Sequence, residues 1–263
     1  MQRWIAPKLR RRSENLHVDF HRYHGELKTL TPDERVIAFF DLDRTIISGY
    51  SVVALALEHV WSGSLSPTRI IAHFGIFLGW TLGKSDYHDL LRLTVNGIVG
   101  LSEDEMIELG ERAFQRRLAG LIYPEARQLI DAHKAVGHRV VMVTSATSFQ
   151  AHPIARELGV DHVLCTELEI QSGVITGKVD PCYGPGKKTA AQKFADQEGL
   201  ALTDAFFYTD SSEDLALLES VGKPVVANAK TSLSRIALEN GWPQLLFESL
   251  GESARTDRRV TVG

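Results

Sequence analysis

Short apolar runs that each end at a polar residue limit the fold of this sequence more than any other feature. Five such runs occur, and none alternates apolar with polar side chains: residues 36–40, 140–143, 163–165, 205–208 and 224–227. Runs of this kind suit strands that are buried on both faces, as in a parallel sheet covered by helices. Helical patterns lie between them. The sequence therefore predicts an α/β fold with a Rossmann-like open parallel sheet.

The helical patterns between the runs carry their own start and stop signals. Residues 124–136 begin with Pro124, which suits a first helical turn, and stop at Gly137. Another helix ends at Gly159. These signals support a repeated strand–helix unit.

The first two runs are separated by far more chain than one crossover helix needs. Between them lie an apolar segment, residues 50–61, and a capping box formed by Ser102 and Glu105. We therefore expect a helical cap domain inserted over residues 47–122. The remaining divisions are a basic arm at 1–34, the α/β core at 35–46 and 123–245, and a tail at 246–263 that we expect to be mobile.

Composition removes several classes of function. The net charge of the 263 residues is −4, which argues against electrostatic binding of nucleic acid. No stretch of about 20 apolar residues is present to span a bilayer, and two cysteines are too few for a disulfide scaffold. We expect a soluble cytoplasmic protein, and the sequence leaves the oligomeric state open.

Two segments raise the alternative of contact with a membrane surface. Residues 1–12 hold five basic side chains beside Trp4 and Ile5, which suits either a solvated arm or peripheral contact with anionic lipid head groups. Residues 70–80 are the most apolar stretch of the chain. They fit a core helix of the cap, or a lip that contacts lipid or an apolar part of a substrate.

Candidate functional residues follow the apolar runs. Asp41 and Thr144 each come directly after a predicted strand, Asp210 comes two positions after the run 205–208, and Lys187 or Lys188 lies in a glycine-rich turn. Ligands of open α/β sheets bind outside the carboxyl ends of the strands. An acid, a hydroxyl, a lysine and a second acid at that edge suit phosphoryl chemistry.

Asp41 and Asp43 are close enough in sequence to repel each other unless a cation or a shared proton intervenes. Magnesium is the natural cation for carboxylate oxygens beside a phosphate, and Asp210 can supply a further carboxylate. Asp41 could then attack phosphorus as a nucleophile. Asp43 could protonate the leaving group and later activate water.

The ordered motifs resemble the haloacid dehalogenase superfamily, and most closely the phosphatases of its subfamily IB, which includes the phosphoserine phosphatases. The resemblance covers roughly residues 35–245 and rests on four motifs and the cap between the first and second: residues 39–45, Thr144, Lys187 and 210–214. It implies a magnesium-dependent phosphatase that acts on a small phosphate ester and forms an aspartyl-phosphate.

The resemblance also implies a role for each matching residue. Asp41 would be the nucleophile, and Asp43 the acid–base whose backbone carbonyl also binds magnesium. Thr144 would bind a phosphoryl oxygen, with Ser145 as the competing choice. Lys187 would balance charge, with Lys188 as the fallback, and Asp210 would bind metal. Asp214 would be an alternate metal ligand, or only the start of a helix.

Three departures from the family pattern concern the substrate. Arg44 replaces the small residue of many relatives, and it suits either an anionic substrate group or solvent. Residues 144–147 lack the two glycines that help phosphoserine phosphatases hold a carboxylate. The cap glutamate expected soon after the first motif is also missing, since the first acid there is Glu58. The last two departures disfavour phosphoserine, and leave histidinol phosphate and lysophospholipid phosphates open.

Two other functions share parts of this pattern. A phospho-accepting signalling module also uses an aspartate, a hydroxyl and a lysine at strand ends, but it needs neither the cap nor Asp43. A dehalogenase shares the superfamily fold without a metal, and the extra carboxylates of Asp43 and Asp210 argue against it.

Overall fold

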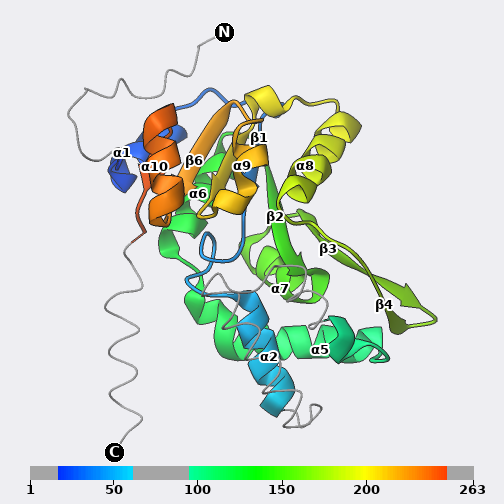
Figure 1. Ribbon diagram of the computed structural model, residues 1–263. Helices are drawn as coiled ribbons and strands as arrows, with labels where there is room; N and C mark the ends of the chain where they lie inside the picture. The colour runs from blue at the N-terminus through cyan, green and yellow to red at the C-terminus, as the bar shows by residue number, and fades with distance from the viewer. Residues whose placement is uncertain (1–16, 62–94, 248–263) are drawn as a thin grey trace, which may run out of the picture.

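The computed structural model describes residues 17–61 and 95–247, and its centre is a seven-stranded sheet (Figure 1). The strand order is β4-β3-β2-β1-β5-β6-β7, and every neighbouring pair is parallel except β3 and β4. The strands are β1 (Ile37–Phe40), β2 (Arg139–Thr147), β3 (His162–Gln171), β4 (Val174–Asp180), β5 (Phe206–Thr209), β6 (Lys223–Ala227) and β7 (Gln244–Leu245). The predicted α/β class is confirmed.

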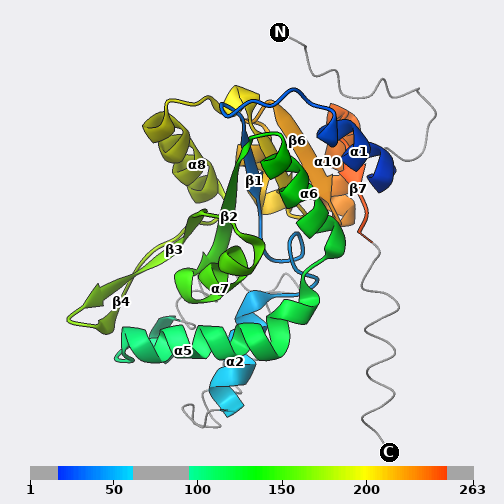
Figure 2. The same cartoon turned by 180° about the vertical axis from the view of Figure 1, so that it is seen from behind.

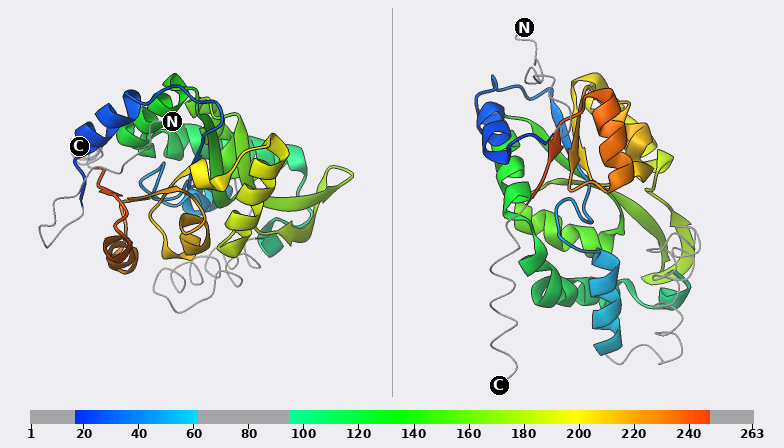
Figure 3. Two further views of the ribbon diagram at one scale, coloured as in Figure 1. Left: turned by 90° about the horizontal axis from the view of Figure 1, so that it is seen from above. Right: turned by 60° about the vertical axis from the view of Figure 1, so that its left-hand side comes forward.

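Helices cover both faces of the sheet, which explains the unalternated apolar runs (Figure 3). Ala38 and Phe40 of β1 pack into one apolar cluster, and Ile37 and Phe39 pack into the other, because successive side chains of a strand point to opposite faces. The first face is covered by α1 (Phe20–Lys28), α6 (Pro124–Ala135) and α7 (Ser148–Leu158). The second is covered by α8 (Pro185–Glu198), α9 (Leu215–Leu218) and α10 (Thr231–Asn240).

Helix α1 lies within the segment that the sequence analysis assigned to the basic arm. It begins after Asp19, whose carboxylate accepts a hydrogen bond of 2.8 Å from the backbone N–H of Arg22. Tyr23 and Leu27 are fully buried in the core cluster that α6 also lines. The chain from residue 17 onward is therefore packed against the sheet domain.

Strands β2 and β3 run beyond their apolar stretches, and the sequence analysis missed β4. The register between β2 and β3 shifts between Val143 and Thr147, so β2 continues past Thr144 in an irregular form. Strands β3 and β4 form a hairpin whose turn residues, Ser172 and Gly173, both have positive φ angles, of 52° and 76°. Two such residues between antiparallel strands match the twist of a tight hairpin.

The inserted cap lies beyond the carboxyl ends of the strands (Figures 1 and 2). Its described parts include α2 (Ser51–Trp61), α5 (Glu103–Ala113), the π-helical turn η1 (Phe114–Leu118) and the 3₁₀ turn η2 (Ala119–Leu121). The predicted capping box is confirmed, because Ser102 and Glu105 each accept the backbone N–H of the other.

An apolar cluster joins the cap to the core domain. Leu55 of α2 and Leu109 of α5 pack with Phe149 of α7, Leu168 of β3 and Ile175 of β4. The hairpin that extends the sheet thus supplies part of the cap's interior, and the two domains share one apolar contact region.

Close backbone contact and a buried acid also tie the cap together. A Cβ atom at Gly110 of α5 would lie 2.1 Å from the carbonyl oxygen of Phe149, so only glycine allows this approach to α7. Glu58 of α2 is buried, and its carboxylate lies 2.8 Å from the guanidinium of Arg116 and within 4.0 Å of those of Arg112 and Arg117. Arginine side chains from α5 and η1 therefore anchor α2 through the carboxylate of Glu58.

Several sequence predictions lie outside the described residues: the basic side chains of residues 1–12, the apolar stretch 70–80 and most of the tail. Within residues 17–61 and 95–247, no helix has the length and apolar character needed to cross a bilayer.

A chain of buried polar side chains runs beneath the sheet face that α6 covers. The Nδ1 atoms of His133 and His138 lie 2.7 Å apart, and His133 Nε2 lies 2.8 Å from the Tyr208 hydroxyl. That hydroxyl is 3.0 Å from the hydroxyl of Tyr23. Burial lowers the pKa of His133 well below its ordinary value. Burial, with the charge of Lys223, lowers the pKa of His138 to about 4.

The two neutral histidines predict a loss of stability in mild acid. Below the ordinary histidine pKa of about 6.5, these two side chains bind protons in the unfolded chain but stay neutral in the folded chain. The free energy of unfolding should therefore fall as the pH drops from about 6.5 toward 5, by up to about 1.4 kcal/mol per pH unit for each histidine. Urea unfolding of the wild type, His133→Gln and His152→Gln over this range checks the prediction. The slope should shrink for His133→Gln and persist for His152→Gln, since His152 is exposed; equal slopes in all three proteins would contradict it.

Candidate active site

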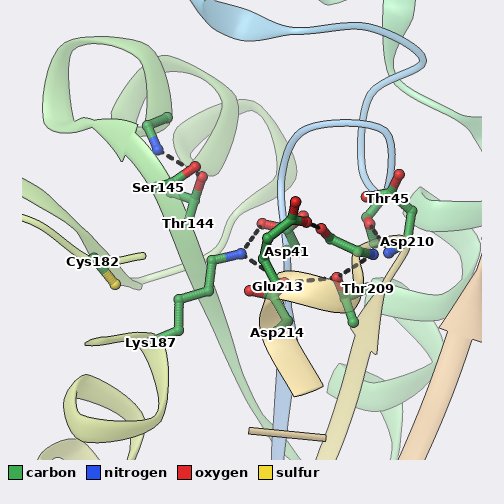
Figure 4. A network of polar contacts seen from close by, with 12 residues as sticks. Asp41, Thr45, Thr144, Ser145, Cys182, Lys187, Thr209, Asp210, Glu213 and Asp214 are labelled. Carbon is green, nitrogen blue, oxygen red and sulfur yellow. Dashed lines mark hydrogen bonds and ion pairs between the residues drawn. The ribbon is translucent and has the colours of Figure 1, made fainter. Parts of the chain in front are cut away.

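Asp41 lies directly after β1, at the edge of the sheet that faces the cap. Its backbone N–H donates to the carbonyl of Tyr208 at 2.9 Å, which continues the pairing between β1 and β5. The side chain is buried, and its Oδ1 lies 2.6 Å from Nζ of Lys187 (Figure 4). Parallel pairing thus fixes the residue that follows β1 beside the residues that follow β5.

Lys187 joins two carboxylates in the interior. Its Nζ also lies 2.8 Å from Oδ2 of Asp214, and the lysine side chain is 4% exposed. Burial opposes the charged lysine, but Asp214 and Asp41 together outweigh it and raise the pKa of Lys187. Lys188, the fallback of the sequence analysis, is exposed. The structure therefore brings Lys187, and not Lys188, to Asp41.

Close packing at the start of α8 sets the position of Lys187. A Cβ atom at Gly186 would lie 2.7 Å from the carbonyl oxygen of Pro181, and Gly184 has a φ of +53°. The glycine-rich turn noted in the sequence thus lets α8 begin close to the end of β4. The first turn of the helix then carries the lysine into the interior.

Asp43 is held at the first turn of the cap helix α2. Its Oδ1 accepts the backbone N–H of Ser51 at 2.7 Å. Burial raises the pKa of Asp43 to about 6, and the Ser51 N–H and Lys187 oppose that rise. A carboxyl group with a pKa near neutrality can both give and take a proton at physiological pH.

Asp210 follows β5 and forms an ion pair with Arg44. Oδ2 of Asp210 lies 2.6 Å from Nε of Arg44. The backbone N–H of Asp210 donates to Oγ1 of Thr45 at 3.1 Å, which fastens the loop after β1 to the end of β5. Sequence reasoning left Arg44 between a substrate group and solvent, and it did not foresee this carboxylate partner.

Asp214 has two partners besides the start of α9. Its Oδ2 accepts the hydroxyl of Thr209 at 2.7 Å as well as the lysine ammonium. The short 3₁₀ helix η4 (Ser212–Asp214) turns the side chain inward. Asp214 is therefore part of the buried charge network, and not only a residue at a helix start.

Thr144 and Ser145 lie near the end of β2, on the side of Lys187 away from Asp210 (Figure 4). Thr144 is fully buried, and its Oγ1 accepts the backbone N–H of Ala146 at 3.1 Å. A hydroxyl that accepts in this way keeps its own proton to donate. The backbone carbonyl of Ser145 accepts the hydroxyl of Thr166 at 2.9 Å, which fixes this end of β2 to β3.

Two residues of the site escaped the sequence analysis. Thr209 donates to Asp214 and accepts the backbone N–H of Ser211 at 3.1 Å. Asn228, which follows β6, has a φ of +53° and donates through Nδ2 to the carbonyl of Arg44 at 3.4 Å. Thr209 and Asn228 each directly follow an apolar run, so the strand-end rule could have found both.

The charges of this cluster do not balance. Asp41, Asp43, Asp210 and Asp214 with Lys187 and Arg44 carry a combined formal charge of −2. Burial raises the pKa of Asp41 well above its usual range, and repulsion from Asp214 and Asp210 adds to the rise despite Lys187. A divalent cation would supply the missing charge, and carboxylate oxygens are the ligands that magnesium prefers.

The donor chemistry therefore fits magnesium, but the carboxylates are not yet gathered. Among residues 17–61 and 95–247, no three acidic, histidine or cysteine side chains converge into a ready-made cation site. Lys187 holds Asp41 and Asp214 together, while Arg44 holds Asp210 separately.

The family model of the haloacid dehalogenase-like hydrolases matches residues 38–219. This chain belongs to that family. The match contains every candidate site residue, from Asp41 to Asp214. The resemblance inferred from the ordered motifs is confirmed.

Individual relatives of this hydrolase agree with that assignment. A probable phosphatase of Mycobacterium tuberculosis is 33% identical over 220 residues, which cover 82% of this chain and 77% of the relative. A phosphoserine phosphatase of the same species is 32% identical over 232 residues, which cover 85% and 74%. A solved structure of a protein of unknown function from Bordetella pertussis has a TM-score of 0.74 at 28% identity, with 80% and 98% of the two chains covered. The protein is an enzyme of the phosphoric monoester hydrolase class.

The buried lysine predicts a specific loss of stability. Lys187→Met removes the only ammonium that contacts both Asp41 and Asp214 among the described side chains, and leaves two carboxylates without their cation. The free energy of unfolding at neutral pH should fall by about 3 kcal/mol. Lys188→Met, at the neighbouring exposed position, should change it by less than about 0.5 kcal/mol. Urea denaturation monitored by circular dichroism checks both values, and equal effects of the two variants would show that the buried pairs do not stabilise the fold.

Proposed function

We propose that this hydrolase is a magnesium-dependent phosphomonoesterase that acts on a small organic phosphate through an aspartyl-phosphate at Asp41. Two neighbouring observations carry the proposal. The Asp41 carboxylate lies 2.6 Å from a buried lysine, and two residues later Asp43 has a pKa of about 6. The lysine contact suits a nucleophilic carboxylate at Asp41. A pKa near neutrality suits Asp43 as the general acid and base that turnover requires.

In the first step an oxygen of Asp41 forms a bond to phosphorus as the bond from phosphorus to the ester oxygen breaks. Asp43 gives its proton to that departing oxygen, so the alcohol leaves neutral. In the second step Asp43 takes a proton from water, and the water oxygen attacks phosphorus. Asp41 is released as a carboxylate, and inorganic phosphate leaves. The two steps return both aspartates to their starting protonation states.

Thr144, Lys187 and a cation would share the charge of the phosphoryl group. The Thr144 hydroxyl has a proton to donate, and Ser145 is the adjacent choice. The ammonium of Lys187 already contacts Asp41. Magnesium would be held by Asp41, Asp210 and the backbone carbonyl of Asp43, with Asp214 nearby. Its charge would let the Asp41 carboxylate approach the anionic phosphate group.

The substrate is proposed to be a small phosphate ester other than phosphoserine. Two of the backbone N–H groups that follow Thr144 already have acceptors: that of Ala146 donates to Thr144 Oγ1, and that of Thr147 donates to Gln150 Oε1 at 2.9 Å. They are therefore occupied where a carboxylate would need them. Histidinol phosphate and lysophospholipid phosphates stay as the alternatives. A lipid substrate would also agree with a cytoplasmic enzyme in peripheral contact with a membrane.

A phospho-accepting signalling module is the alternative within a different class of function. Such a module would keep the phosphoryl group on Asp41 and would need no acid–base. The contact of Asp43 with the first residue of the cap helix and the relatives named as phosphatases favour turnover.

Replacement of the nucleophile gives the first test. The wild type should release phosphate from p-nitrophenyl phosphate with magnesium, and Asp41→Asn should lower kcat by at least about 10³-fold because no covalent intermediate can form. Asp204→Asn, an exposed aspartate away from the site, serves as the matched control. Undiminished release by Asp41→Asn would refute the mechanism. A phosphorylated wild type that persists for hours without steady release would favour the signalling module.

The occupied N–H groups give a prediction about the substrate. Phosphoserine should have a kcat/KM at least about tenfold lower than the best substrate of a panel, since one unmade charge-assisted hydrogen bond is worth roughly that factor. The panel contains phosphoserine, histidinol phosphate, glycerol phosphate and lysophosphatidate, with release of inorganic phosphate as the readout. Preference for phosphoserine would contradict this interpretation, and preference for lysophosphatidate would favour the lipid alternative.

A further inference from the structure

Arg44 occupies a backbone position that suits glycine better than arginine. Its φ is +63°, in the left-handed region where a side chain is strained. The loop fixes this conformation, because the backbone N–H of Arg44 donates to the carbonyl of Gly49 at 3.1 Å and its carbonyl accepts from Asn228. A strained residue that persists at an active site points to a contribution from its side chain.

The side chain of Arg44 reaches the carboxylate that follows β5. Nε of Arg44 lies 2.6 Å from Oδ2 of Asp210, whose side chain is 6% exposed. The guanidinium carbon lies 6.0 Å from the centre of the ring of Tyr50, the residue that precedes α2. The arginine is therefore a local cation for a buried acid, and the lysine of the site is engaged elsewhere.

This ion pair divides the carboxylates of the site between two side-chain cations. Asp41 and Asp214 share Lys187, whereas Asp210 is drawn to Arg44. A divalent cation bound at Asp210 would either take the oxygen that Arg44 holds or place two positive charges beside the guanidinium. In the first case the cation displaces the guanidinium from the carboxylate. In the second case the positive charges of the cation and the guanidinium repel each other.

We propose that Arg44 is a built-in counter-ion that occupies Asp210 in the metal-free enzyme and competes with the divalent cation for it. The inference rests on the magnesium dependence proposed above. Arg44 neutralises Asp210 and lowers the affinity for the cation, so metal binding is coupled to release of the arginine from that carboxylate.

Magnesium binding to the full chain, measured without substrate, tests this role. Arg44→Gly removes the side chain and suits the backbone, so this variant should fold. Arg44→Gln keeps a side chain of similar length without its charge. Arg127→Gln, which removes a surface partner of Glu157, is the matched control for loss of one positive charge. Isothermal titration with magnesium chloride gives the dissociation constants. Thermal unfolding with and without magnesium gives a second readout that does not depend on catalysis.

Both Arg44 variants should bind magnesium about tenfold more tightly than the wild type, because each lacks the competing charge-assisted hydrogen bond. Their melting temperatures should also rise more on addition of magnesium. Arg127→Gln should match the wild type in both measurements.

Three results would overturn the inference. Unchanged or weaker binding in both Arg44 variants would show that the arginine does not compete. Tighter binding in Arg44→Gly alone would assign the effect to the backbone, and an equal gain in Arg127→Gln would assign it to net charge. A wild type that neither binds magnesium nor needs it would refute the proposed metal dependence itself, which distinguishes that failure from the failure of the role of Arg44.

Discussion

The contact of one buried ammonium with two carboxylates is the interaction on which the rest of the site depends. Lys187 comes from α8, Asp41 from the end of β1 and Asp214 from the segment after β5, so three distant parts of the chain meet at one nitrogen atom. A buried ion pair is rarely a large net source of stability, because desolvation offsets much of the attraction. The contacts of Lys187 instead fix the positions of the three side chains. Each charged group would be costly to bury without its partner, so the folded state keeps all three together.

The parallel sheet makes that meeting unavoidable. Because β1, β2 and β5 run in the same direction, Asp41, Thr144 and Asp210 come out at one edge (Figures 1 and 4). The cap then adds a contact that no strand end could supply, the N–H of Ser51 on the carboxylate of Asp43. The residue proposed to move protons is thus fixed by the insertion, while the proposed nucleophile is fixed by the sheet.

The sequence was sufficient for the features that depend on periodicity and order. Buried strands that lead to Asp41, Thr144 and Asp210 could be predicted because apolar runs and strand direction place polar residues together, although β2 continues past Thr144 to Thr147. The hairpin of β3 and β4 could not, since residues 174–180 have one buried side chain, Ile175, among exposed and partly buried ones and contain no apolar run. The partner of Arg44 was also beyond prediction, because it lies 166 positions away and depends on how two loops meet. Asn228 lay within reach of the strand-end rule and was overlooked.

The apolar region shared by Leu55, Leu109, Phe149, Leu168 and Ile175 has a consequence for how substrates enter. A lid that swings on a hinge must separate cleanly from the body beneath it, but here a helix and a hairpin of the body complete the interior of the described insertion. Wide opening would bring these side chains into water, and the carbonyl of Phe149 is already pressed against Gly110. The described part of the insertion is therefore packed onto the body as one continuous apolar layer, and any movement that separates the two carries the cost of hydrating that layer.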